Sequence, residues 1–168
     1  AEVPLAGQVQ GLLELARREP AMDLSRVGIF GTSFGGYLAA LAVLRRPDVF
    51  HVAVAAAPVA DWLDYDTHYT ERYLGVPLPG DEAALAAYTR NSLLTYARTL
   101  LRPLFIVHGT ADDNVHFVHS LKLADALFRA HKEFEFLPMI GKTHNLEAAD
   151  TVVMFHARVL GFFQRTLP

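Results

Sequence analysis

The feature that most constrains the fold is a serine between two glycines, directly after a short apolar run. Val27-Gly28-Ile29-Phe30 has the character of a buried strand, and Gly31-Thr32-Ser33-Phe34-Gly35 follows it without a spacer. The residues after Gly35 predict a helix that ends before Pro47, so the serine lies where a strand turns sharply into a helix. Small residues at Gly31 and Gly35 would let the two backbones approach closely. This G-x-S-x-G pattern in this context predicts a nucleophile elbow.

A serine on such a turn points its hydroxyl group outward, beside the start of the following helix. Unpaired amides and the positive end of the helix dipole meet there, so the Phe34 backbone N–H is a candidate oxyanion donor. In the structural alternative, Ser33 only caps the helix. The strand before the turn and the small-residue helix after it favour Ser33 as a nucleophile.

A serine nucleophile needs a histidine to accept its proton and an acid to orient that histidine, in the chain order Ser, Asp, His. Leu104 to Val107 is an apolar run typical of a strand, and the loop His108-Gly109-Thr110-Ala111-Asp112-Asp113-Asn114 follows it. Asp112 is the preferred acid, and Asp113 is the alternative because either aspartate is able to cap the loop.

The candidate general base is His144, in the loop from Met139 to Asn145 that follows the next predicted strand. The remaining histidines suit structural or surface roles. His131 and His156 lie in or beside amphipathic helices, and His51 precedes a strand. His108 ends a buried strand, where we expect it to satisfy a backbone group. His116 and His119 are spaced for one helical face, but without cysteine or an evident third ligand we expect no metal site.

Composition narrows the class of protein. The 168 residues are 52% hydrophobic, which is enough for one domain with a sizeable core. The chain has a net charge of −3, so it does not have the excess of basic residues that is typical of a nucleic-acid-binding domain. No segment has the pattern of a transmembrane helix or a signal peptide. The absence of cysteine excludes disulfides and thiol catalysis and leaves the cellular compartment open.

Strands and helices alternate along the chain, which predicts an α/β fold with a mainly parallel sheet. We expect strands at 27–30, 52–56, 104–107 and 133–137, and helices at 7–18, 35–46, 117–130 and 147–164. Residues 59–100 form a long excursion that carries Trp62, Tyr65, Tyr69 and Tyr73, with one helical stretch near 81–88. Long excursions of this kind usually form lids or pockets.

Together these motifs resemble the catalytic domain of the prolyl oligopeptidase superfamily. Tyr69-Thr70-Glu71-Arg72-Tyr73-Leu74-Gly75 and the loop from His108 to Val115 resemble its dipeptidyl peptidase IV branch. The resemblance covers nearly the whole chain and implies an α/β-hydrolase fold with Ser33 as nucleophile, Asp112 as acid and His144 as base. It also implies that residues 1–168 are the C-terminal part of the catalytic domain, without the upstream strands and the β-propeller.

The resemblance further implies a proline-sized pocket. Its implied lining is Phe34, Val59, Trp62, Tyr65, Tyr69 and Val115, and Asn114 matches a residue that hydrogen-bonds a substrate carbonyl. Aromatic walls hold a flat pyrrolidine ring well, although the same side chains also suit a core. Two departures from the family pattern are Thr32, where the branch commonly has tryptophan, and Lys142-Thr143-His144-Asn145, where an acidic segment and a glycine usually flank the base.

The function implied is that of a serine peptidase that hydrolyses peptide bonds after proline or alanine and, in the full-length protein, releases N-terminal dipeptides. No cofactor or metal is expected. The alternatives are an esterase of the same fold and an inactive fragment or binding scaffold. We also expect self-association, as a dimer or larger, through an unpaired strand at 27–30 or through the apolar stripe Val152, Phe155, Val159 and Phe162.

Overall fold

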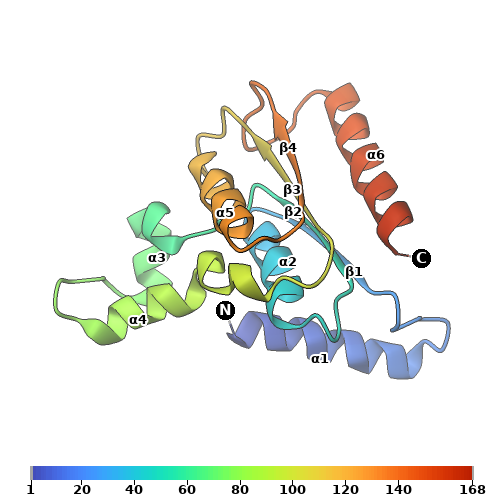
Figure 1. Cartoon of the computed structure of the whole chain (residues 1–168), viewed down its shortest axis with the longest axis horizontal. Coiled ribbons are helices and arrows are strands. Elements are labelled where there is room, and N and C mark those ends of the chain that lie inside the picture. Colours follow the sequence, from blue (N-terminus) through green and yellow to red (C-terminus); the bar gives the residue numbers. More distant parts are fainter. Residues whose placement is uncertain (1, 168) are drawn as a thin grey trace.

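The structure is a computed structural model that describes residues 2–167, and its centre is one sheet of four strands (Figure 1). These strands are β1 (Gly28–Thr32), β2 (Val52–Ala56), β3 (Leu104–Gly109) and β4 (Glu135–Met139). They lie in the order β1-β2-β3-β4, and every pairing is parallel. The prediction of an α/β fold with a parallel sheet is therefore confirmed. Because the strands are parallel, their carboxyl ends meet at one edge of the sheet, where the loops are free to carry a site.

Helices cover both faces of this sheet. They are α1 (Glu2–Arg18), α2 (Phe34–Arg45), α3 (Thr67–Leu74), α4 (Glu82–Asn91), α5 (Val118–Arg129) and α6 (Ala149–Thr166), with 3-10 turns at Trp62–Asp64 and Leu93–Thr99. In Figure 1, α2 and α5 lie on one side of the sheet and α6 on the other. Within residues 2–167, no helix is both long and apolar enough to cross a membrane.

The two central strands are buried because both of their faces are covered, which accounts for their continuous apolar sequences. Alternate side chains of a strand point to opposite faces. Ala53, Ala55, Leu104 and Ile106 join the cluster that contains α2 and α5, whereas Val52, Val54, Phe105 and Val107 pack with α6. The core thus has two layers that share one sheet.

Strand β1 forms an edge of the sheet, with β2 as its sheet neighbour, and its Phe30 side chain is 40% exposed. Self-association through this edge stays a prediction. The second association surface was predicted wrongly: Phe155, Val159 and Phe162 of α6 are buried against the sheet. An amphipathic stripe does not show by itself whether it packs inside its own domain or against another chain.

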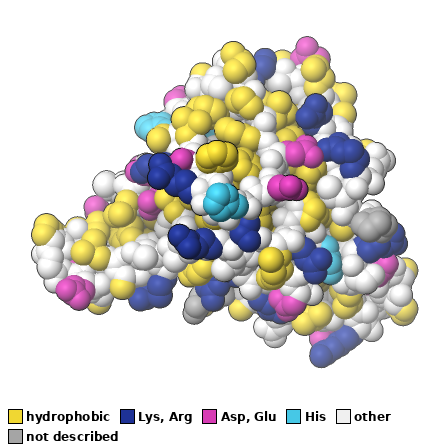
Figure 2. All heavy atoms as spheres, viewed as in Figure 1, with side chains coloured by type: hydrophobic (Ala, Val, Ile, Leu, Met, Phe, Trp, Pro, Cys, Tyr) yellow, Lys and Arg dark blue, Asp and Glu magenta, His cyan; other side chains and the backbone are white. Residues whose placement is uncertain are grey.

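The excursion between β2 and β3 is more helical than its sequence suggests. Helix α3 was not predicted, and Tyr69 lies on it rather than in a loop. The Asp66 side chain caps α3 by accepting the Tyr69 backbone N–H, and Gly75, with φ of 82°, ends it. Helices α3 and α4 project from the body as an arm, and Figure 2 shows hydrophobic side chains along it. Tyr73 of α3 and Leu78 of the loop between the two helices are exposed.

One other boundary differs clearly from prediction. Helix α1 starts at Glu2 rather than at residue 7, because its buried stripe begins with Leu5 and continues through Val9. Proline at position 4 is compatible with the first turn of a helix, where its missing N–H costs no hydrogen bond. The remaining strands and helices outside the excursion agree with their predicted ranges to within two residues.

Candidate active site

Ser33 occupies the turn between β1 and α2. Its φ of 61° and ψ of −122° lie in a region that is costly for a residue with a side chain. The Ser33 N–H donates to the Ala56 carbonyl over 2.9 Å, which ties the turn to the end of β2. The side chain makes no capping hydrogen bond to α2. The helix-cap interpretation therefore does not describe this serine, and its hydroxyl group is not engaged by the helix that follows.

Two glycines make this turn sterically possible. A Cβ atom at Gly31 would clash with the backbone of Gly35, and a Cβ atom at Gly36 would clash with the Ala56 carbonyl. A Cβ atom at Gly35 would meet nothing within 4 Å, so the expectation that Gly35 itself must be small was wrong. The backbone of Gly35 is the surface on which Gly31 packs, and Gly36 is the second position where a side chain does not fit.

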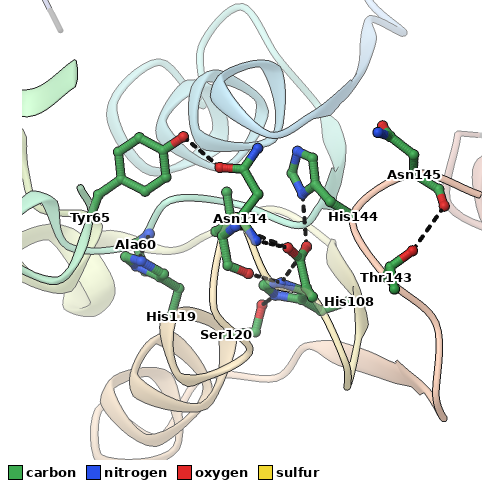
Figure 3. Close-up of polar contacts among 11 residues, drawn as sticks. Ala60, Tyr65, His108, Asn114, His119, Ser120, Thr143, His144 and Asn145 are labelled. Atoms are coloured by element: carbon green, nitrogen blue, oxygen red, sulfur yellow. Dashed lines mark hydrogen bonds and ion pairs between the residues drawn. The ribbon is translucent and has the colours of Figure 1, made fainter. Parts of the chain in front are cut away.

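Asp112 and His144 come from adjacent strands, in the loops after β3 and β4. His144 Nδ1 donates to Asp112 Oδ2 over 2.8 Å (Figure 3). Asp112 is 6% exposed, whereas Asp113 is exposed on the surface of the same loop. Asp112 is thus the aspartate that the structure pairs with His144. With its Nδ1 proton engaged, His144 has Nε2 as the nitrogen left to accept another proton.

The Asp112 carboxylate is held by its own loop. Its Oδ1 accepts the backbone N–H groups of Asn114, over 3.0 Å, and Val115, over 2.9 Å. An aspartate that bonds to amides two and three residues ahead closes a tight turn. The turn therefore fixes the direction in which Oδ2 faces His144, which spacing along the sequence did not reveal.

The two loops that carry this pair are packed backbone against backbone. The Ala111 N–H donates to the Lys142 carbonyl and the Thr110 N–H to the Met139 carbonyl, each over 3.0 Å. A Cβ atom at Gly109 would clash with the Lys142 carbonyl. These contacts hold the segment from Lys142 to Asn145 in place without the acidic residues and glycine of the family pattern.

A cavity lies between the strand that ends in the elbow and the loop that carries His144. This cavity of about 330 Å³ is lined by Thr32 of the elbow, Gly109 of the Asp112 loop and His144, together with residues of α6. Ser33 follows Thr32 in the chain but is not itself among the lining residues. The carboxyl ends of β1, β3 and β4 therefore bring the three predicted site residues to the same edge of the sheet.

The aromatic residues of the predicted pocket gather beside the elbow. Trp62 stacks on Tyr69 with ring centroids 5.8 Å apart, and Tyr65 packs edge-on against both. The ring centroid of Phe34 lies 6.2 Å from that of Trp62. Phe34, Trp62 and Tyr69 line a cavity of about 400 Å³, whereas Val59, Tyr65 and Val115 lie outside its lining. Val59 and Val115 are buried, so within this cluster they serve as packing.

Tyr65 and Asn114 are joined by a hydrogen bond. The Tyr65 hydroxyl donates to Asn114 Oδ1 over 2.8 Å (Figure 3). Burial raises the pKa of Tyr65, so this hydroxyl keeps its proton at neutral pH. Because Asn114 is exposed and its amide oxygen is occupied, its NH₂ group is the part that faces outward as a donor.

Two buried histidines, His108 and His119, make contacts that their positions in the sequence did not predict. His108 satisfies the Val115 carbonyl, as predicted for a backbone group, but it also lies 3.2 Å from Asp112 Oδ2. His108 and Asp112 are only four residues apart at the end of one strand, and this spacing was the sequence feature from which the contact could have been predicted. His116 precedes α5, so the expectation that it shares a helical face with His119 was wrong. Within residues 2–167, no three His, Asp or Glu side chains are grouped to hold a metal ion.

His119 supports the start of the excursion. Its Nδ1 accepts the Ala60 N–H over 3.3 Å, and its side chain is fully buried beside Tyr65. Burial lowers the pKa of His119 to about 4. The neutral ring therefore belongs to the folded state, and it holds the segment from which Trp62 and Tyr65 project.

This buried histidine predicts a pH dependence of stability. The folded pKa lies below the unfolded value of roughly 6.5, so stabilisation is complete above pH 6.5 and is lost as the pH falls toward 4. Between pH 7 and 4.5 we expect the natural protein to lose about 2.5 kcal/mol more unfolding free energy than a His119→Asn variant, which keeps an acceptor without titrating. Chemical unfolding at both pH values measures this difference, and equal losses would contradict it.

Proteins of similar sequence and structure are known. Residues 2–168 match the sequence profile of the prolyl oligopeptidase family. Dipeptidyl peptidase 8 of Homo sapiens is 36% identical over 168 residues, which cover 99% of this chain and 18% of that protein. Dipeptidyl peptidase 4 of Bos taurus is 34% identical over 146 residues, which cover 84% of this chain and 19% of that protein.

The fold has a close counterpart among crystal structures. A candidate dipeptidyl aminopeptidase IV from Bacteroides ovatus matches with a TM-score of 0.87 and 32% sequence identity, over 95% of this chain and 22% of that chain. The four-stranded parallel sheet and its flanking helices thus have the α/β-hydrolase arrangement. The chain spans about one fifth of the length of these relatives.

Proposed function

The chain belongs to the prolyl oligopeptidase family, and we propose that it carries the catalytic triad of a serine peptidase, with Ser33 as nucleophile, Asp112 as acid and His144 as base. The observation that carries this proposal is the bond of 2.8 Å between His144 Nδ1 and Asp112 Oδ2, at the same sheet edge as a strained serine that caps no helix. The dipeptidyl peptidases among its relatives support release of N-terminal dipeptides by the natural protein that contains this chain.

In the proposed reaction, Ser33 Oγ attacks the substrate carbonyl carbon while His144 Nε2 takes its proton. The carbonyl oxygen becomes an oxyanion and accepts a hydrogen bond from the Phe34 N–H, at the positive end of α2. His144 then gives the proton to the leaving amine, which leaves an acyl group on Ser33. Water then attacks the acyl group while His144 Nε2 takes its proton. The proton returns to Ser33 Oγ, and the cleaved peptide leaves as a carboxylic acid. Asp112 stays ionised throughout and stabilises the imidazolium of His144.

The aromatic cluster supports a preference for proline in the residue before the cleaved bond. Phe34, Trp62 and Tyr69 offer flat apolar walls to a pyrrolidine ring. The outward NH₂ group of Asn114 is suited to a substrate carbonyl, and its hydrogen bond from Tyr65 keeps it in that orientation. Alanine is small enough to enter the same site.

Selectivity tests this proposal. We expect the natural protein to be labelled at Ser33 by a fluorophosphonate and to cleave Gly-Pro amides with a higher kcat/KM than Gly-Leu amides. Replacing Tyr69 with alanine removes one wall and should lower this proline-to-leucine ratio by about 5- to 150-fold, the effect of losing 1–3 kcal/mol of discrimination.

Tyr96→Ala, which changes a tyrosine outside the aromatic cluster, is the control and should leave the ratio unchanged. A ratio that survives Tyr69→Ala would make Tyr69 a packing residue only. Turnover of short-chain esters without any peptide cleavage would favour the esterase alternative, and absence of labelling would favour an inactive scaffold.

A further inference from the structure

His108 lies at the end of β3 with no exposed surface, and both of its ring nitrogens have partners (Figure 3). Nδ1 is 2.7 Å from Ser120 Oγ of α5. Nε2 is 2.8 Å from the Val115 carbonyl oxygen and 3.2 Å from Asp112 Oδ2. The ring thus connects helix α5 with the turn that contains Asp112.

These partners define the proton positions on the ring. A carbonyl oxygen only accepts, so His108 Nε2 carries the proton that points at Val115 and Asp112. Burial lowers the pKa of His108, so the ring is neutral and Nδ1 is left to accept the Ser120 hydroxyl proton. A single tautomer therefore fits this site, in which the Ser120 hydroxyl donates to His108 and His108 donates to Asp112.

The hydrogen bonds of Asp112 show what this donor does. Its Oδ1 accepts the two backbone amides of the turn, and its Oδ2 accepts His144 Nδ1 and His108 Nε2. Each carboxylate oxygen therefore has two donors, and the two histidines meet at the same oxygen. Rotation of the carboxylate would break hydrogen bonds on both sides.

His108 also connects the acid with a neighbouring residue. Val115 donates its N–H to Asp112 Oδ1 and accepts the His108 proton at its carbonyl, and its side chain is fully buried. Phe117 packs edge-on against the His108 ring at 5.5 Å, which limits rotation of the imidazole. The turn from Asp112 to Val115 is therefore closed by one side chain that approaches from inside the fold.

We propose that His108 is a positioning residue of the triad: through its Nε2 proton it sets the orientation and basicity of Asp112 Oδ2, and thereby the readiness of His144 to accept a proton. This inference rests on the proposed function, because it concerns how Asp112 acts on the base. It adds a fourth side chain to the proposed triad, with Ser120 hydrogen-bonded behind it as a fifth.

The test measures the rate of fluorophosphonate labelling of Ser33 in the natural protein between pH 5 and 9. His108→Leu removes the donor and should slow labelling about 10- to 100-fold, the usual effect of losing a hydrogen bond to a charged group. With one donor fewer, the Asp112 carboxylate stabilises the protonated form of His144 more strongly. The acid limb of the pH profile should therefore move to higher pH by about half a unit. His108→Gln keeps an N–H near the position of Nε2 and should restore most of the rate and the original acid limb.

His51→Leu is the matched control, because His51 is a half-buried histidine that accepts a backbone N–H at the opposite end of the sheet. It should not move the acid limb. A His108→Leu variant with fewer active molecules but an unmoved acid limb would overturn the proposal and leave His108 a packing residue. If that variant does not fold, Ser120→Ala decides: it weakens the same donor and should shift the limb in the same direction by less, and an unmoved limb again overturns the proposal.

Failure of the proposed function has a different signature. A wild-type protein that is labelled but cleaves no proline peptide refutes the substrate, and the labelling profiles still test His108. If wild type is not labelled at all, the low-field proton resonance of His144 Nδ1–H in histidine-labelled protein is the readout. His108→Leu should shift this resonance and His108→Gln should restore it, whereas an unshifted resonance in both would overturn the proposal.

Discussion

Replacing Ser33 with alanine is expected to lower the kcat of the natural protein for Gly-Pro amides by about a millionfold, because members of a triad act as one unit. The substitution removes the attacking oxygen and nothing that holds the turn. The elbow is fixed by the Ser33 N–H bond to Ala56 and by the close packing at Gly31 and Gly36, none of which uses the hydroxyl group. Steady-state kinetics and the unfolding midpoint together measure the effect.

The matched control is Ser25→Ala, since the Ser25 hydroxyl bonds to Asp23 in an exposed loop at the other end of β1. It should leave kcat unchanged. The unfolding midpoint of Ser33→Ala should also equal that of wild type. Residual turnover by Ser33→Ala within tenfold of wild type would refute the assignment of the nucleophile.

Replacing Asp112 with asparagine should lower kcat about ten-thousandfold. The amide is nearly the same shape as the carboxylate, but its NH₂ group cannot accept the Nδ1 proton of His144, so the base adopts the wrong tautomer for proton transfer from Ser33. The variant also loses the negative charge that stabilises the imidazolium. Steady-state kinetics with Gly-Pro amides measures the loss.

Asp113→Asn is the control for this effect, because it makes the same chemical change one residue later, on an exposed side chain. Its kcat should stay within about tenfold of wild type, as expected for a surface substitution away from buried hydrogen bonds. A large loss in Asp113→Asn with a small one in Asp112→Asn would exchange the two roles.

Much of the fold was predictable because its central strands have unambiguous sequences. Strands β2 and β3 are covered on both faces, so they appear as continuous apolar runs bounded by polar loops. Helix α3 was not predictable in the same way. Its sequence from Thr67 to Leu74 is mainly polar and aromatic, and its position depends on the stacking of Tyr69 against Trp62 and on the Asp66 cap.

The candidate site shows the same division between local and tertiary information. Ser33 could be located from local sequence, because a strand, two glycines and a helix together define the elbow. The choice between Asp112 and Asp113 could not, because both belong to one polar loop. It depends on a turn closed by two backbone amide donors, and on a base that arrives from a different strand. The contact of His108 with Asp112 likewise depends on how the chain folds back over the strand end.

The excursion between β2 and β3 carries most of the proposed substrate pocket and none of the proposed triad. Ser33, Asp112 and His144 all lie outside residues 57–103, as does Phe34, whereas Trp62, Tyr65 and Tyr69 lie inside this one contiguous segment. Its two ends are anchored in strands at the centre of the sheet. Exchange of this segment would replace Trp62, Tyr65 and Tyr69 together and leave Ser33, Asp112 and His144 on their own backbone supports.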